Sequence, residues 1–160
     1  MIIEKGIYYA KNEIYQMINN IGGDCGKPGR RPIVCLIKSI EHPEIFWAIP
    51  MGAVSHRSEN AMKRIRQYLA YEDADIRSCF YHLGRTTTRS IFFISDAFPI
   101  TDNYIEECHL GYNDVHYIIK NHILISELER KLFRILAYEN ANPNYFRQRI
   151  TDVKKYLLQN

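Results

Sequence analysis

Residues 31–37 read Arg31-Pro32-Ile33-Val34-Cys35-Leu36-Ile37 and place five consecutive apolar side chains directly after a proline. A short apolar run rich in β-branched residues is typical of a buried strand. After a turn over residues 39–43, a second run follows, Ile45-Phe46-Trp47-Ala48-Ile49. Because the connection is short, we expect the two strands to pair in an antiparallel way. Pro50 is expected to end the second strand.

Three more short runs have the composition of strands. Residues 7–9 are Ile-Tyr-Tyr, and the runs at 78–83 and 90–94 are joined by a connection over 84–89. β-Branched and aromatic residues are favoured in strands. We therefore expect about five strands, with residues 97–100 extending the last of them.

Helical spacing of apolar side chains occurs outside these runs. It predicts a helix after Asn12, one capped by Ser58, a long one from about Val115, and a last one over about 145–158. Strands concentrated early and helices late are typical of an α+β domain. We expect a compact, strongly bent antiparallel β-barrel with flanking helices and a helical C-terminal part, in a single domain over residues 1–160.

Composition limits the class of protein. Hydrophobic residues are 46% and charged residues 24% of the 160, which excludes a disordered chain. The first five residues lack the features of a signal peptide, and no apolar run approaches the roughly 18 residues that span a bilayer, so we expect a cytoplasmic protein without membrane contacts. Cys25, Cys35, Cys79 and Cys108 form no Cys-x-x-Cys pair. We expect free thiols, no metal site and no cofactor.

Charge is segregated along the chain. The net charge is +3, but residues 57–90 and 127–160 carry +3 each, whereas residues 91–126 carry −4. Basic segments that meet in space can bind a polyanion, because phosphate contacts dominate nucleic-acid affinity. Lysines and arginines that only solvate helix faces produce the same pattern. If the basic segments form a groove for RNA, we expect the acidic segment to face away from it.

Five motifs, taken in order, carry a resemblance to a known family. They are Ile7-Tyr8-Tyr9-Ala10 with Ile14-Tyr15 in the next helix, Arg31-Pro32-Ile33-Val34-Cys35-Leu36, Phe46-Trp47-Ala48-Ile49-Pro50 with a small polar loop, Ser78-Cys79-Phe80-Tyr81-His82-Leu83, and Ile91-Phe92-Phe93-Ile94 with Pro99-Ile100. Together they resemble the ToxN/AbiQ toxins of type III toxin–antitoxin systems, whose barrel architecture is that of the MazF/PemK ribonucleases. The resemblance covers most of the chain. Family members often carry Thr-Ser-Pro-Lys in the loop where this chain has Gly52-Ala53-Val54-Ser55-His56-Arg57.

The resemblance implies a metal-independent, sequence-selective endoribonuclease toxin. In such cleavage the ribose 2′-OH attacks the adjacent phosphorus and leaves a 2′,3′-cyclic phosphate and a 5′-OH. The resemblance also implies two RNA partners, a small structured RNA antitoxin made of repeats and a cellular or phage RNA substrate. It further implies assembly into a protein–RNA hetero-oligomer and a role in phage defence by abortive infection.

Candidate catalytic residues lie in the loop over residues 51–58. Ser55, His56 and Arg57 offer a hydroxyl, an imidazole and a guanidinium, groups suited to proton transfer and to phosphoryl charge. With the resemblance, we expect His56 to transfer protons, Ser55 to orient the phosphate, and Arg57 and Arg31 to stabilise its charge. By its residues alone, the tripeptide also fits a solvated loop before a helix.

Contacts to flanking RNA are expected from basic and hydroxyl side chains, which commonly bind phosphate oxygens. The candidates are Arg30, Lys38, Lys63, Arg64, Arg66, Arg85, Thr86, Thr87, Thr88 and Arg89. Some tyrosines, Tyr9 among them, can stack on unpaired bases. Four other histidines, His82, His109, His116 and His122, are interpreted as structural.

Three alternatives stay open. Arg77 and His82 fit the Arg-x4-His pattern of the HEPN ribonucleases, although that family places the pair on a helix and the intervening residues here are β-prone. A non-catalytic RNA- or DNA-binding module would keep the basic segments and would not need His56. A MazF/PemK type II toxin would be inhibited by a protein instead of an RNA.

Overall fold

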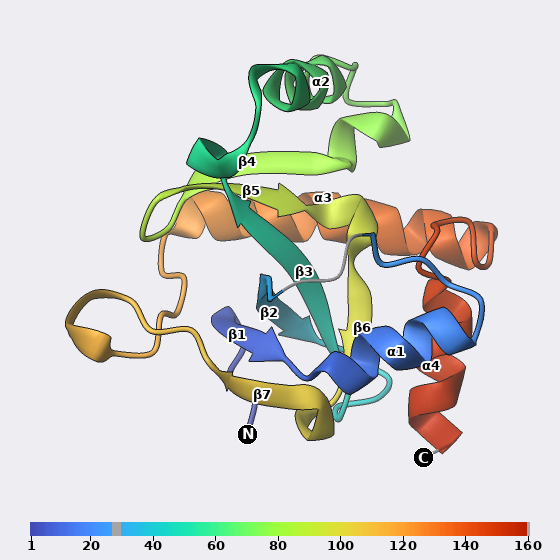
Figure 1. The fold of residues 1–160 in the computed structure, drawn as a ribbon. Coiled ribbons are helices and arrows are strands. Elements are labelled where there is room, and N and C mark those ends of the chain that lie inside the picture. Colours follow the sequence, from blue (N-terminus) through green and yellow to red (C-terminus); the bar gives the residue numbers. More distant parts are fainter. Residues whose placement is uncertain (27–29, 160) are drawn as a thin grey trace.

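The computed structural model describes residues 1–26 and 30–159 (Figure 1). In this part of the chain, seven strands form one antiparallel sheet in the order β4-β5-β3-β2-β1-β7, and β6 pairs with β3. The strands are β1 Gly6–Ala10, β2 Pro32–Lys38, β3 Phe46–Ala53, β4 Tyr81–Arg85, β5 Arg89–Phe93, β6 Phe98–Ile100 and β7 Ile105–Cys108. The helices are α1 Asn12–Asn20, α2 Glu59–Leu69, α3 His122–Ala141 and α4 Ile150–Gln159.

Strand β3 joins the two halves of the sheet. Residues 46–48 pair with β6, and residues 51–53 pair with β5, while β2 pairs along the other edge of β3 as predicted. Pro50 lies where β3 changes partner, and a proline fits a strand only where no N–H has to be donated to the ladder. The expectation that Pro50 ends the strand is therefore wrong, because β3 continues to Ala53.

The sheet is covered on both faces. Helix α3 packs on one face through residues such as Leu128 and Leu132, which share a buried cluster with Val34 and Leu36 of β2. Helices α1 and α4 pack on the other face, in a cluster that holds Ile33 and Cys35. A strand buried on both faces has a continuous apolar sequence, which explains the unbroken run in β2.

The α+β class with C-terminal helices is confirmed, but the sheet does not close into a barrel. Among the described strands, β4 and β7 lie at opposite ends of the order and do not pair. After the short strand β7, residues 109–119 run back beside β1, where Ile7 N donates to Tyr117 O at 3.0 Å and His109 N donates to Ile7 O at 2.9 Å. This segment thus takes the hydrogen bonds of Ile7, the part of β1 that β7 does not pair with.

Three element boundaries differ from the prediction. Helix α3 begins at His122 instead of about Val115, because Asn121 caps it by accepting from Ile123 N at 3.0 Å and Leu124 N at 3.1 Å. The last helix begins at Ile150, after Arg149, whose φ of 56° is left-handed. Residues 97–100 do not extend β5 but contain the separate strand β6.

Two further differences concern strands. Residues 76–79, partly assigned to a strand, form a 3-10 turn before β4. Strand β7 was not predicted, because its sequence Ile-Glu-Glu-Cys is short, charged and mostly exposed. Helix α2 begins as expected after Ser58, whose Oγ accepts from Ala61 N at 3.1 Å.

Two chemical findings accompany the fold. None of the helices in the described ranges has the length and apolar character needed to cross a membrane. All four cysteines are free thiols; Cys35 and Cys79 are buried, whereas Cys108 is exposed.

Ile135 and Ile123 provide a matched test of packing within one helix. Ile135 is 0% exposed in the cluster under α3, whereas Ile123 is 79% exposed on the same helix. We expect Ile135→Ala to lower the free energy of unfolding by about 2–5 kcal/mol, because it leaves a cavity in the core. Ile123→Ala is expected to change it by less than about 0.5 kcal/mol. Urea denaturation measures both values, and equal losses would contradict the packing of α3 on the sheet.

Candidate functional site

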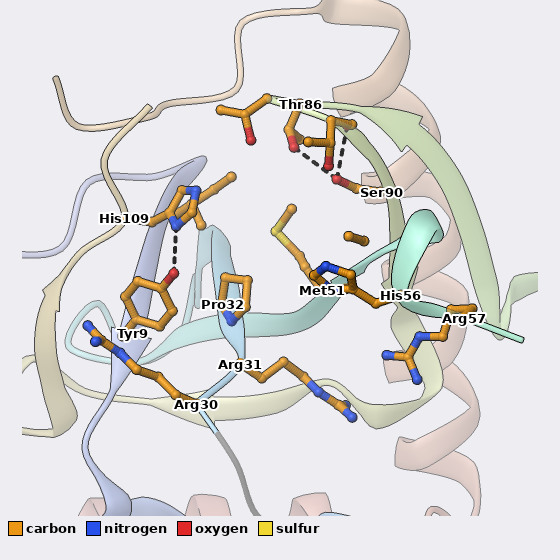
Figure 2. A pocket seen from close by; sticks show the side chains of 15 residues that line it. Tyr9, Arg30, Arg31, Pro32, Met51, His56, Arg57, Thr86, Ser90 and His109 are labelled. Carbon is orange, nitrogen blue, oxygen red and sulfur yellow. Dashed lines mark hydrogen bonds between the residues drawn. The ribbon is translucent and has the colours of Figure 1, made fainter. Parts of the chain in front are cut away.

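A cleft of about 450 Å³ opens beside Arg31, Arg57, His56 and His109 (Figure 2). It is bounded by β1, the start of β2, the end of β3 with the turn that follows, the β4–β5 turn, and the residue after β7. We call it the central cleft. It is lined by Ile7, Tyr9, Arg30, Arg31, Pro32, Met51, Gly52, Ala53, His56, Arg57, Thr86, Thr87, Thr88, Ser90 and His109.

Two guanidinium groups share one aromatic ring at this cleft. The Cζ atoms of Arg31 and Arg57 lie 5.0 Å and 4.9 Å from the centroid of the Phe93 ring. Arginines that stack on an aromatic face gain from its negative potential. Figure 2 shows both side chains on the same side of the cleft, and the sequence analysis had assigned both to phosphoryl charge.

Neither of these two arginines has an acidic partner in the described part of the chain. Arg57 Nε is buried and without a hydrogen-bond partner among the described residues. Burial, and secondly the like charge of Arg31, lower the pKa of Arg57. Buried polar groups are normally paired. Two neighbouring cations with an unused donor therefore form a site that an anion would complete.

The backbone around β3 sets the position of Arg57. Residues 54–56 form a 3-10 turn, in which Arg57 N donates to Val54 O at 3.0 Å, and Ser58 caps α2 immediately afterwards. Gly52 leaves room for the guanidinium, since a Cβ there would lie 2.7 Å from an Arg57 terminal nitrogen. The turn also brings His56, which is exposed, to the margin of the cleft.

The β4–β5 turn contributes a group of hydroxyls. Thr86 N donates to Thr88 O at 2.9 Å, and the Thr86 and Ser90 hydroxyls are 2.9 Å apart. Ser90, which is 4% exposed, also donates to Thr88 O at 3.3 Å. The turn is thus held by its own side chains. Figure 2 shows Thr86 and Ser90 across the cleft from Arg30 and Arg31.

A second histidine lines the cleft, and sequence reasoning had interpreted it as structural. The Tyr9 hydroxyl and His109 Nδ1 are 2.9 Å apart, and Nε2 makes no hydrogen bond within the described chain. Burial, and secondly His116, lower the pKa of His109. Tyr9 and His109 are one hundred residues apart, so only the β1–β7 pairing could reveal the contact. Figure 2 places His109 opposite His56.

The acidic segment does not entirely face away from the cleft. Glu107 lies opposite Tyr9 in the β1–β7 register and forms an ion pair with Arg30, whose Cζ lies 4.0 Å from the Tyr9 ring centroid. Glu107 is therefore at the margin of the cleft, and the expectation is wrong for this residue. Asp102, by contrast, accepts from Ile2 N at 2.7 Å near the N-terminus.

Only some of the predicted RNA-binding residues line the central cleft, namely Arg30 and the three threonines 86–88. Ser55, Arg85 and Arg89 line an adjoining hollow together with Thr87 and Thr88. Orienting the reacting phosphate, the role expected of Ser55, therefore fits the hydroxyls of the β4–β5 turn better.

The other predicted basic residues are not brought to the cleft. Lys63, Arg64 and Arg66 are exposed on α2 and outside the cleft lining. Lys38 lies at the end of β2 away from Arg31, where its N donates to Glu4 Oε2 at 3.1 Å. The prediction that these four residues bind RNA rests on their positive charge alone, and charge does not indicate where in the fold a residue lies.

The Arg77–His82 pair does not form a HEPN-like site. Arg77 donates to Asp75 at 2.7 Å and to the Tyr71 hydroxyl at 3.0 Å. His82 lies on β4, and burial, followed by the nearby charge of Lys131, lowers its pKa to about 4. In the described structure, Arg77 is therefore engaged by Asp75 and Tyr71, and His82 is buried on β4 near Lys131.

Comparison with known proteins adds no family assignment. No model of a known protein family matches the chain, and none of the curated proteins compared with it is significantly similar. Within the described residues, no group of three or more His, Cys, Asp or Glu side chains is arranged to hold a metal ion. The function is therefore inferred from the chemistry of the central cleft.

Anion binding at Arg31 and Arg57 can be measured by thermal unfolding. We expect inorganic phosphate at ten times its Kd to stabilise the protein by about 1.4 kcal/mol, a rise in Tm of roughly 3–5 °C compared with NaCl of equal ionic strength. Arg57→Met should abolish this rise without lowering the Tm in NaCl, because it removes an unpaired cation and keeps an apolar contact with Phe93. Arg66→Met on α2 is the control. A phosphate effect retained in Arg57→Met would contradict the site.

His82 is expected to make stability depend on pH. Its pKa is about 4 in the folded protein, whereas an unfolded histidine has a pKa of about 6.5. Between these values the unfolded chain binds the extra proton, so the free energy of unfolding should fall as the pH is lowered from about 6.5 to about 4. His82→Gln should show a smaller decrease in urea denaturation across this window, and the exposed His122→Gln serves as control. Parallel curves for wild type and His82→Gln would refute this.

Proposed function

We propose that this protein is a metal-independent endoribonuclease of the ToxN/AbiQ kind. One observation carries the proposal: the unpaired guanidiniums of Arg31 and Arg57 share a cleft with the imidazoles of His56 and His109. Arginines suit phosphate oxygens because the guanidinium presents several donors in one plane. Imidazoles transfer protons near neutral pH. Metal-free cleavage of RNA requires these two functions together.

The cleavage step transfers two protons. The 2′ oxygen forms a bond to phosphorus and loses its proton, while the bond from phosphorus to the 5′ oxygen breaks and that oxygen gains a proton. Because the entering and leaving oxygens lie on opposite sides of phosphorus, two proton-transfer groups are best placed on opposite walls of the site. His56 and His109 have this relation across the cleft (Figure 2).

We assign the proton acceptor to His109 and the donor to His56. The lowered pKa of His109 favours a neutral imidazole. When its Nδ1–H donates to the Tyr9 oxygen, Nε2 becomes the acceptor for the 2′ proton. Tyr9 is then a positioning residue that fixes the tautomer and the ring. His56 returns a proton to the 5′ oxygen.

The remaining charge and flanking RNA have separate contacts. Arg31 and Arg57 stabilise the added charge on the phosphoryl oxygens, and neither guanidinium has to break an ion pair within the described chain to do so. The Thr86 and Ser90 hydroxyls lie at the far wall for a further phosphate oxygen. RNA beyond the cleft would follow the adjoining hollow with Arg85 and Arg89.

The biological partners belong to the same proposal. As in the family that the sequence resembles, a small structured repeat RNA would bind the cleft as antitoxin and assemble with the protein into a hetero-oligomer. The toxin would act on cellular or phage RNA in the cytoplasm, as in abortive infection. A tandem nucleotide repeat directly upstream of the coding sequence would favour this type III arrangement over a type II toxin with a protein inhibitor.

RNA cleavage in EDTA tests the activity. We expect the pure protein to cut single-stranded RNA and to leave a 2′,3′-cyclic phosphate. His56→Ala and His109→Ala should each lower the rate at least about 100-fold, because a positioned acid or base contributes that much. The exposed His122→Ala is the matched control and should cut at the wild-type rate.

Other outcomes of the cleavage experiment would distinguish the proposed enzyme from the alternative functions. Wild-type protein that binds but does not cut varied RNAs would favour a non-catalytic RNA- or DNA-binding module. Normal cleavage by His56→Ala would remove His56 from the mechanism while leaving the enzyme. Tyr9→Phe should lower the rate less than His109→Ala and change its pH profile, because it loses only the hydrogen bond that orients the imidazole.

A further inference from the structure

A second, smaller pocket of about 110 Å³ shares the lining residue Arg31 with the central cleft. Arg31 lines both, so the two cavities are neighbours. The pocket walls include Tyr15 from α1, Phe98 from β6, Cys25, Asp96 and Gln148. It has no role in the mechanism proposed above.

Gln148 lines this pocket and has one hydrogen-bond acceptor without a partner in the described chain. Its side chain is 2% exposed, and its Nε2 donates to Ser95 O at 2.9 Å and to Ala97 O at 2.6 Å. Because both partners are carbonyl oxygens, the amide orientation is settled, and Oε1 is the acceptor. Oε1 is buried without a hydrogen-bond partner in the described chain. A buried acceptor of this kind is costly unless a ligand donates to it.

The apolar walls suit a flat ring. The Tyr15 and Phe98 rings meet edge to face, with centroids 5.9 Å apart. Burial raises the pKa of Tyr15 to about 12, so the phenol keeps its proton and remains a donor. Burial likewise raises the pKa of Cys25 to about 11, so the thiol is neutral. The pocket thus offers aromatic surface, one phenol donor and the Gln148 acceptor.

The charge in this pocket differs from that of the central cleft. Asp24 and Asp96 line it, and both are held by Arg147, at 3.8 Å and 3.2 Å. Carboxylate oxygens accept hydrogen bonds and disfavour anions. The carboxylates therefore make this pocket less favourable for a phosphate than the central cleft, where Arg31 and Arg57 have no acidic partner in the described chain. The two cavities together match a molecule with an anionic part beside a neutral, flat part rich in N–H donors.

We propose that this second pocket binds the nucleobase next to the phosphate held in the central cleft, and that it selects bases with an exocyclic amino group over uracil. The inference rests on the proposed action on RNA. The amino group would donate to Gln148 Oε1 and to the carboxylate edge, while Tyr15 donates to a ring nitrogen or carbonyl. Uracil lacks an amino group and leaves the acceptors partly unused. The pocket therefore determines sequence selectivity, with Gln148 and Tyr15 as its reading residues.

Binding of RNA fragments that cannot be cut tests the pocket directly. The probes are 2′-O-methylated dinucleotides with each base varied in turn against uracil, measured by calorimetry. At one of the two positions, we expect an amino-bearing base to bind at least about fivefold more tightly than uracil, the lower range for one good base contact. Tyr15→Phe should weaken the binding of every base that fits the pocket, because it removes only the phenol donor to a ring nitrogen or carbonyl.

Two neighbouring asparagines provide a blocking variant and its control. Asn19 is exposed at the end of α1 and lines the pocket, whereas the exposed Asn20 does not. Asn19→Trp should fill the pocket and remove the base preference, with the affinity for inorganic phosphate unchanged. Asn20→Trp should retain the preference. Gln148 itself is left intact, since its two amide hydrogen bonds support the fold.

Each outcome separates the inference from the proposed function. Equal affinity for all bases at both positions, a preference retained in Asn19→Trp, or no dinucleotide binding at millimolar concentration would overturn the base pocket. If RNA is cut all the same, the proposed function stands without it. If the preference is found but no RNA is cut, the pocket is a nucleotide-binding site and the proposed catalysis fails.

Discussion

The change of partner along β3 is the constraint on which the site depends. Residues 46–48 of this strand pair with β6, residues 51–53 pair with β5, and Pro50 lies between. Because β3 does not end at Pro50, it reaches past the edge of β2 and carries the turn over 54–56 to the open side of the sheet. That extension places Arg57 on Phe93 next to Arg31. A strand ending at the proline would leave these groups apart.

The open sheet and the cleft have a common origin. Residues 109–119 take up hydrogen bonds of β1 without joining β4, and Tyr112 in this segment donates to Thr87 O at 3.2 Å. The chain thus bridges from β1 to the β4–β5 turn, and His109 and the threonines of that turn line the central cleft. A closed barrel would fill this space with side chains. The opening is therefore what makes room for two arginines, two histidines and the threonine turn around one ligand.

The two cavities differ in the chemical groups that they offer to a ligand. The central cleft holds unpaired cations, which destabilise the empty protein and favour an anion; sites of this kind are commonly maintained at a cost in stability. The second pocket holds an unpaired acceptor beside aromatic rings. Arg31 forms the wall between them. A ligand that satisfies both at once must be anionic at one end and neutral, flat and rich in donors at the other.

Local patterns determined the α+β class, the pairing of the two central strands and the helices after Asn12 and Ser58, while the family resemblance selected the candidates Arg31, His56 and Arg57. Apolar periodicity, caps and residue chemistry act over a few positions, so one sequence suffices to read them. Only the tertiary structure decided that the sheet stays open, that Lys38 and the basic residues of α2 lie outside the cleft, and that His109 meets Tyr9. These outcomes depend on strand register between residues up to one hundred positions apart, and register follows from packing of the whole sheet rather than from any single segment.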